Sequence, residues 1–246
     1  MQEPVSQRGL SAAGTAPRHR QRAASARGSQ TRERLLDAAE RLWGQRGVEG
    51  VSLREIRLAA GQRNSSALQF HFGGRRGLLL ALTQRHLPRV ASAQEDLHRA
   101  VVADGRQDDL TALTEVLVRP DAEYLRRGPS ERAWIKISAE LLARPETMLG
   151  DIAAHAPPPA VLVGKQIYEQ LARMVEPDVA VERLLSVLVA VRHLCAARAR
   201  LEDASPGGVG RSVLPFDRWL ANLLDMAVAA LGAPPRTLTD PRRTDG

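Results

Sequence analysis

The chain of 246 residues is long enough to bury a sizeable core, either as one domain or as a small domain joined to a larger one. Its formal net charge of +7 is unevenly spread, because residues 1–76 carry 14 basic and 6 acidic side chains. The single cysteine excludes an intrachain disulfide and a thiolate metal cluster, and the apolar run from Leu184 to Val191 is too short to cross a bilayer. We therefore expect a soluble, cytoplasmic protein with no membrane segment, metal or cofactor.

Residues 1–29 hold small, polar and basic side chains and few large apolar ones. Such a segment buries too little apolar surface to offset the entropy lost on ordering, so we expect a disordered basic arm. The charge of residues 1–76 suits a polyanionic partner such as nucleic acid. Biased codon usage is an alternative reason for the preference for arginine over lysine, but it does not account for the uneven distribution.

A group of three short helices is expected at residues 30–76. From Thr31 onward, apolar side chains recur at the spacing of one helical face. They are Leu35, Leu36, Ala39, Leu42 and Trp43. Gly47 is a suitable end for this helix. Glu55 then follows Ser52 at the spacing of a capping box, which indicates the start of a second helix.

Gly61 allows the chain to turn sharply after the second helix. A third helix is expected from about Asn64 to Gln69 or slightly beyond, with Phe70 and Phe72 packing it onto the other two. Three short helices with a small-residue turn between the second and the third are typical of a helix-turn-helix module.

Residues 77–232 are expected to form a larger helical domain, and residues 233–246 a flexible tail. Leu78, Leu79, Leu82 and Leu87 indicate a helix that Pro88 would kink. Further helical patterns cover residues 108–126, 130–143, 146–155, 160–175, 177–201 and 216–231. Because no segment shows convincing strand alternation, the predicted fold is all-α, with an N-terminal helix-turn-helix domain followed by the larger helical domain.

A helix that reads the major groove of DNA needs polar side chains for base edges and neighbouring groups that bind phosphates. The stretch from Ser52 to Arg76 offers both kinds. The candidates for the groove are Arg63, Asn64, Ser65, Ser66 and Gln69, and those for phosphates are Ser52, His71, Arg75 and Arg76. Asn64 and Gln69 can pair with adenine, and Arg63 with guanine or phosphate. A merely solvated helix face is the alternative interpretation of the same spacing.

Thr31 to Leu82 resembles the DNA-binding domain of the tetracycline-repressor (TetR) family of transcription regulators. The matching features, in order, are "LLDAAERLW", Gly47, "SLREI", "AAG" and "FHFGGRRGLL". The resemblance assigns a phosphate contact to Arg75 and the helix-capping hydroxyl to Ser52. The turn "GQRNSSALQ" is one residue longer than the common pattern, and Gln69 stands where a phosphate-binding tyrosine is usual.

The resemblance implies a transcriptional repressor that binds a double-stranded DNA operator as a homodimer, with a larger domain that binds a small-molecule effector and dimerises. Residues 179–199 are apolar on more than one face, so this helix is buried within the chain or forms a four-helix interface together with the helix of residues 216–231. The candidate residues for the effector pocket are Trp134, Met148, Tyr168 and Met174.

Two other functions compete with a specific regulator. An enzyme is not expected, because the chain has no phosphate-binding loop, no nucleophile elbow and no zinc-protease motif, and its histidines lack ligand spacing. A nonspecific nucleic-acid-binding or scaffold protein that uses the basic N-terminal region is the remaining alternative.

Overall fold

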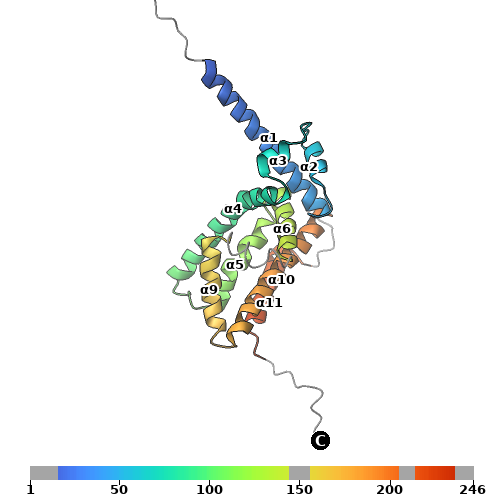
Figure 1. The fold of residues 1–246 in the computed structure, drawn as a ribbon. Helices are drawn as coiled ribbons and strands as arrows, with labels where there is room; N and C mark the ends of the chain where they lie inside the picture. Colours follow the sequence, from blue (N-terminus) through green and yellow to red (C-terminus); the bar gives the residue numbers. More distant parts are fainter. Residues whose placement is uncertain (1–15, 144–155, 205–213, 236–246) are drawn as a thin grey trace, which may run out of the picture.

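The computed structural model describes residues 16–143, 156–204 and 214–235, with side chains from residue 28 onward. These residues contain nine helices and no strand, which confirms the all-α prediction (Figure 1). The helices are α1 (Ala16–Arg46), α2 (Leu53–Ala59), α3 (Ala67–Phe72), α4 (Arg75–Ala103), α5 (Leu110–Tyr124), α6 (Pro129–Leu142), α9 (Pro158–Leu171), α10 (Pro177–Asp203) and α11 (Phe216–Leu231). None of them is long and apolar enough to span a membrane.

The first helix begins well before the predicted position. The sequence predicts a disordered arm through residue 29, whereas α1 is helical from Ala16, so the prediction is wrong for residues 16–29. These residues are mainly alanine and arginine, which are good helix formers, and Pro17 lies in the first turn, where proline is tolerated. The helix ends at Arg46, and Gly47 takes the left-handed conformation (φ 81°), as the sequence predicts.

The second and third helices are joined by a turn that contains Gly61 at φ 68°. The capping box at the start of α2 is present as predicted. The third helix begins at Ala67, three residues later than expected, because Asn64 and Ser66 form a hydrogen-bonded turn instead of a helical one. Gly73 in the left-handed conformation ends α3.

The remaining helices form the larger domain, called the body here. α4 runs through Pro88 to Ala103 as one helix, and α5 returns beside it. α10 packs against α6, α9 and α11 (Figure 1). The predicted helix at residues 146–155 lies outside the described residues.

α1 and α6 cross at a very short distance, and this crossing joins the N-terminal helices to the body. A Cβ atom on Gly44 would lie 2.5 Å from the Cβ of Ala133 and 2.9 Å from its Cα. Only glycine fits there, because real Cβ atoms do not approach other atoms so closely. Near the end of α1, the Glu140 carboxylate on α6 accepts a 2.8 Å hydrogen bond from the Val48 amide.

A buried carboxylate lies near the same crossing. Glu40 of α1 is only 3% exposed, and groups from α4 and α6 surround it. Arg85 donates to its Oε2 (2.8 Å), the Ser130 hydroxyl donates to its Oε1, and His86 Nε2 lies 2.9 Å from Oε1. Burial alone would raise the pKa of Glu40, but its contacts with His86, Ser130 and Arg85 outweigh this effect and hold the pKa below its ordinary value of 4.5.

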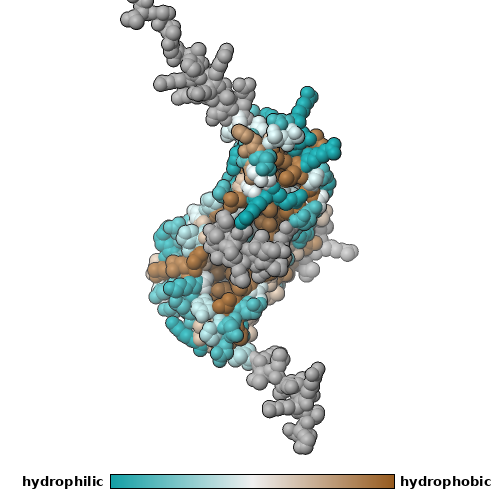
Figure 2. All heavy atoms as spheres, in the orientation of Figure 1, coloured by the Kyte–Doolittle hydropathy of each residue, from teal (hydrophilic) through white to brown (hydrophobic). Residues whose placement is uncertain are grey.

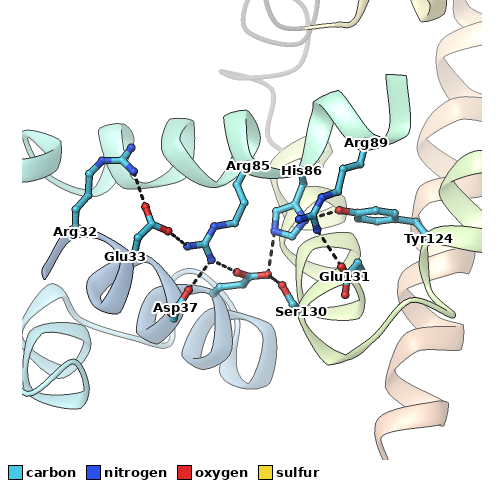
Figure 3. Close-up of polar contacts among 10 residues, drawn as sticks. Arg32, Glu33, Asp37, Arg85, His86, Arg89, Tyr124, Ser130 and Glu131 are labelled. Atoms are coloured by element: carbon cyan, nitrogen blue, oxygen red, sulfur yellow. Dashed lines mark hydrogen bonds and ion pairs between the residues drawn. The ribbon is translucent and has the colours of Figure 1, made fainter. Parts of the chain in front are cut away.

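The neighbours of Glu40 are themselves held by further contacts (Figure 3). Arg85 also pairs with Glu33 (2.6 Å) and Asp37 (2.7 Å) on α1. The His86 ring is fully buried, contacts the Tyr124 hydroxyl through Nδ1 (2.9 Å) and stacks on Trp134 at a centroid distance of 5.2 Å. The cluster therefore connects α1 to three helices of the body, α4, α5 and α6.

Replacing Gly44 with alanine should force α1 and α6 apart. We expect Gly44→Ala to lower the free energy of unfolding by about 1–3 kcal/mol, the usual cost of overpacking a core. Urea denaturation followed by circular dichroism measures this change. Gly28→Ala is the matched control in the same helix, because a Cβ there meets nothing within 4 Å and alanine favours helix. If Gly44→Ala were as stable as the control, the crossing would not be tight; a second substitution, Ala133→Gly, should restore only part of the stability, because the Cα of residue 133 would still lie 2.9 Å from the new Cβ.

Replacing Glu40 with glutamine should remove a charge that stabilises the fold. We expect Glu40→Gln to lower the free energy of unfolding by about 1–3 kcal/mol at neutral pH, because its charged hydrogen bonds weaken. The folded-state pKa of Glu40 lies below 4.5, so the carboxylate contributes above that pH and its contribution is lost as the pH falls through the lowered pKa. Urea unfolding from neutral pH down to about pH 3 should show the two proteins converging in acid. A difference independent of pH would contradict this role.

Candidate nucleic-acid interface

Ser52 lies at the exposed N-terminus of α2, where it is held by Glu55. The Ser52 amide donates to Glu55 Oε2 (2.8 Å), and the Glu55 amide donates to Ser52 Oγ (3.2 Å). These backbone and side-chain hydrogen bonds from Ser52, with a 2.7 Å contact from Arg46, lower the pKa of Glu55 to about 2. The start of α2 is therefore rigid, with the amide groups of its first turn near the surface.

The turn between α2 and α3 is braced from within. The Arg57 guanidinium donates to the carbonyls of Gln62 (2.6 Å) and Arg63 (3.0 Å), so the turn is fixed on α2. Asn64 Oδ1 accepts hydrogen bonds from the amide (3.0 Å) and the hydroxyl (2.8 Å) of Ser66. The Asn64 oxygen predicted to bind adenine thus already has two donors, which gives this residue a structural role in the turn.

α3 presents one face to the core and another to solvent. Ala67 and Leu68 are buried, and Phe72 packs against the same core beneath the guanidinium of Arg32 on α1 (5.1 Å to the ring centroid). Gln69 and Phe70 are exposed, together with Ser66 just before the helix. Helical spacing of three and four residues places Ser66, Gln69 and Phe70 on one face, which we call the α3 outer face.

Phe70 corrects a prediction. The sequence predicts that Phe70 packs α3 onto the core, but the structure leaves its side chain 80% exposed. Because successive residues of a helix differ by about 100°, Ala67, Leu68 and Phe72 occupy the core side and Phe70 falls on the opposite side. The signal in the sequence was the pair of adjacent small and apolar residues at 67 and 68, which already fill the core side.

The residues predicted to bind phosphates are placed differently from one another. Arg75 donates to the carbonyls of Val48 and Val51 (3.0 Å to the latter) and so ties the loop before α2 to the start of α4. Arg76 is exposed on the next residue, and His71 is half-buried, with its ring 5.0 Å from that of Phe70. Arg63 and Ser65 are exposed in the turn. Their contacts with DNA, and that of Arg75, stay predictions.

The structure describes three of the four residues predicted for an effector pocket. Trp134 is buried and stacks on His86, Tyr168 is half-buried, and Met174 is 48% exposed beyond the end of α9. Met148 lies outside the described residues. The structure instead has a groove of about 820 Å³ between α1, α6 and the end of α10, where Arg132 and Lys136 both pair with Asp203 (2.6 Å each). The predicted pocket stays a prediction.

The surface around α3 combines hydrogen-bonding groups with basic side chains. Figure 2 shows hydrophilic residues projecting from the end of the molecule that carries α2 and α3. Within the described residues, no group of three or more histidine, cysteine, aspartate or glutamate side chains is placed to hold a metal ion. The side chains at this end offer hydrogen bonding, cation–phosphate contact and apolar contact through Phe70.

Comparison with known proteins identifies the N-terminal helices. The family model described as "Bacterial regulatory proteins, tetR family" matches residues 35–82. The "HTH-type transcriptional repressor AcnR" of Corynebacterium glutamicum is 30% identical over 115 residues, or 46% of this chain. The match covers 61% of that protein, so the chain spans about three fifths of the relative's length. Salmonella enterica GusR matches 82% of this chain and 95% of its own, with 19% identity and a TM-score of 0.39.

The matched residues extend from the packed part of α1 to Leu82 in α4. They include α2, the braced turn and the whole of α3. Over these residues, the chain is similar to the tetR family of bacterial regulatory proteins.

Proposed function

We propose that this protein is a sequence-specific DNA-binding transcriptional regulator and that it acts as a repressor released by a small-molecule effector. The observation that carries the proposal is the α3 outer face, an exposed set of side chains on a helix whose other face is locked into the core. A relative with 30% identity over 115 residues is described as a transcriptional repressor, which supports the same function. The proposal includes no enzymatic activity, and it places the protein in the cytoplasm with the DNA that it binds.

In this proposal, contacts to bases and contacts to phosphates come from different residues. Gln69 can accept and donate at an adenine edge, while Arg63, Ser65 and Ser66 approach the groove from the turn. Ser52, His71 and Arg76 lie around α3 and fix the register on phosphates. Arg75 supports them by holding the loop before α2, and Asn64 by shaping the turn.

Phe70 adds an apolar contact to this surface. Single exposed apolar residues are common on protein surfaces, but Phe70 lies beside Gln69 on the α3 outer face, where the proposed DNA contact is made. In the major groove, the thymine methyl group is the apolar feature that a phenylalanine can contact. We therefore assign Phe70 to thymine recognition beside Gln69.

The proposed homodimer uses α10 and α11. α10 packs against other helices on one side and leaves Ala190, Leu194, Ala197 and Leu201 exposed along another. Their spacing of three and four residues makes one apolar stripe, and Met226 on the neighbouring α11 is also exposed. Two such helix pairs form a four-helix interface across a two-fold axis, which would present two α3 helices to a palindromic operator.

Effector release needs a connection between the body and α3. An effector that prefers one arrangement of the body helices would shift the spacing of the two α3 helices and lower the affinity for the operator. The Glu40 cluster and the Gly44 crossing are the contacts by which α4 and α6 would move α1.

Selection of bound duplexes from a random pool tests the proposed function. We expect the protein to enrich a roughly palindromic sequence and to bind it about 1,000-fold or more tightly than random duplex at moderate salt. Equal affinity for selected and random duplexes would refute a specific regulator and favour the nonspecific alternative. Adding metabolites to the selected complex then identifies those that release it.

The same operator provides a sharp test of Phe70. Replacing the contacted thymine with uracil removes one methyl group and should weaken binding by about 0.8 kcal/mol, or about fourfold. The variant Phe70→Ala should bind more weakly and no longer distinguish thymine from uracil at that position. Leu58→Ala is the control, because Leu58 is also exposed but lies on α2. If Phe70→Ala kept the preference for thymine at every position, the assignment would be wrong.

Sedimentation velocity tests the proposed dimer. Leu194→Asp places a charge in the apolar stripe and should weaken dimerisation by at least about a hundredfold, because the charge would be buried without a partner. Val161→Asp, on the exposed side of α9, should leave the dimer intact. A wild-type protein that sediments only as a monomer, or a Leu194→Asp variant that still dimerises fully, would exclude this interface.

A further inference from the structure

We propose that the N-terminal extension of α1, residues 16–30, is a second DNA-binding element that contacts the phosphate backbone beside the site of α3. The inference rests on the proposed function and goes beyond the helix-turn-helix domain, since the family match begins only at residue 35. We call these residues the arm helix.

The arm helix is continuous with the part of α1 that packs in the core. Among the side chains of α1 that the structure describes, from residue 28 onward, the first buried one is Leu35, and Arg32 covers Phe72 of α3. Residues 16–30 lie before this packed part of the helix, and at 1.5 Å per residue they extend by about 22 Å. In Figure 1 the dark blue start of α1 continues past α3 and away from the body. An element of this kind projects from the end of the molecule that carries the α3 outer face.

The arm helix carries only positive formal charge. Its arginines are Arg18, Arg20, Arg22 and Arg27, and no acidic residue lies between Glu3 and Glu33. Residues 77–246, by contrast, carry a net charge of −1. A basic segment next to a surface proposed to read DNA bases complements the phosphate charge, and such contacts release counterions from the duplex.

The composition of the arm helix argues against other partners. No leucine, isoleucine, valine, methionine or aromatic residue lies between Leu10 and Leu35. A helix that docks in a protein groove needs apolar anchors, and one that lies in a membrane surface needs an apolar face. Phosphate contact needs neither, because charge supplies the free energy. An arm of about 22 Å reaches along about six base pairs at 3.4 Å each.

The test uses the full chain and the duplex selected with it. In the arm variant, Arg18, Arg20, Arg22 and Arg27 are changed to glutamine, which preserves helix propensity and removes the charge. The control variant changes Arg99, Arg106, Lys165 and Arg173 of the body to glutamine, so both variants lose the same formal charge. Circular dichroism checks that both remain folded, and the substitutions of the arm variant all precede the first buried residue of α1.

The test measures the salt dependence of binding, the length of the footprint and the ratio of affinities for selected and random duplexes. We expect the first two to change in the arm variant alone. The slope of log Kd against log salt should fall by about 0.9 for each phosphate that the arm helix no longer neutralises, a total of about 2–4 for each subunit that binds the duplex. The hydroxyl-radical footprint should shorten, while the ratio of affinities for selected and random duplexes should stay within about threefold, because base contacts are intact. An arm variant with the wild-type slope and footprint would overturn the inference, as would an equal fall of slope in the control variant.

The outcomes separate this inference from the proposed function. If the wild-type protein has no preferred duplex, the proposed function fails. If it has a preferred duplex and the arm variant matches it in slope and footprint, only the role of the arm helix fails. Arm-dependent binding to vesicles of anionic lipid, with DNA binding independent of the arm, would likewise overturn it in favour of a membrane surface.

Discussion

The arrangement of the N-terminal helices on the body depends on one buried carboxylate. Glu40 belongs to α1, yet the groups that stabilise its charge, Arg85, His86 and Ser130, belong to α4 and α6. A carboxylate so buried costs several kcal/mol when its partners are removed. α1 therefore cannot turn relative to α4 and α6 unless these contacts break together. At the nearby crossing, Gly44 lets the two helices approach closely enough for those contacts to form.

Because of this constraint, a movement of the body helices would directly change the position of the α3 outer face. α3 packs on α1 through Phe72 and Arg32, and Arg75 at the start of α4 holds the loop between α1 and α2. A small rotation of α4 would thus act on α3 from two sides. The coupling free energies typical of allosteric proteins, about 1–3 kcal/mol, are no larger than the loss of one or two charged hydrogen bonds. The Glu40 cluster is of the right strength to be held in one state and broken in another.

The parts of this fold that were predictable from sequence are those set by neighbouring residues. The capping box of Ser52 and Glu55 and the stop at Gly47 depend only on local spacing, and the structure has both. The outward direction of Phe70 was missed because six residues give less than two helical turns, too few for periodicity to choose a face. The contact of Glu40 with His86 joins residues from two helices, and nothing local to either one predicts it. Composition alone led to the prediction that residues 16–29 are disordered. These residues are helical because a helix already nucleated in a packed core extends at little further cost in free energy.

The arrangement of the helices relates the uneven charge of the sequence to the proposed contacts with DNA phosphates. Contacts to base edges would let α3 distinguish one DNA sequence from another, but a helix of six residues can make few such contacts. In the proposed function, affinity for the duplex then comes largely from phosphates, and residues 1–76 carry 14 basic against 6 acidic side chains. In the proposed function, a body with almost no net charge would not compete for DNA, and binding would be confined to the end that carries α3. Because the arm helix is continuous with α1, a motion transmitted through Glu40 would move the proposed phosphate contacts together with the proposed base contacts.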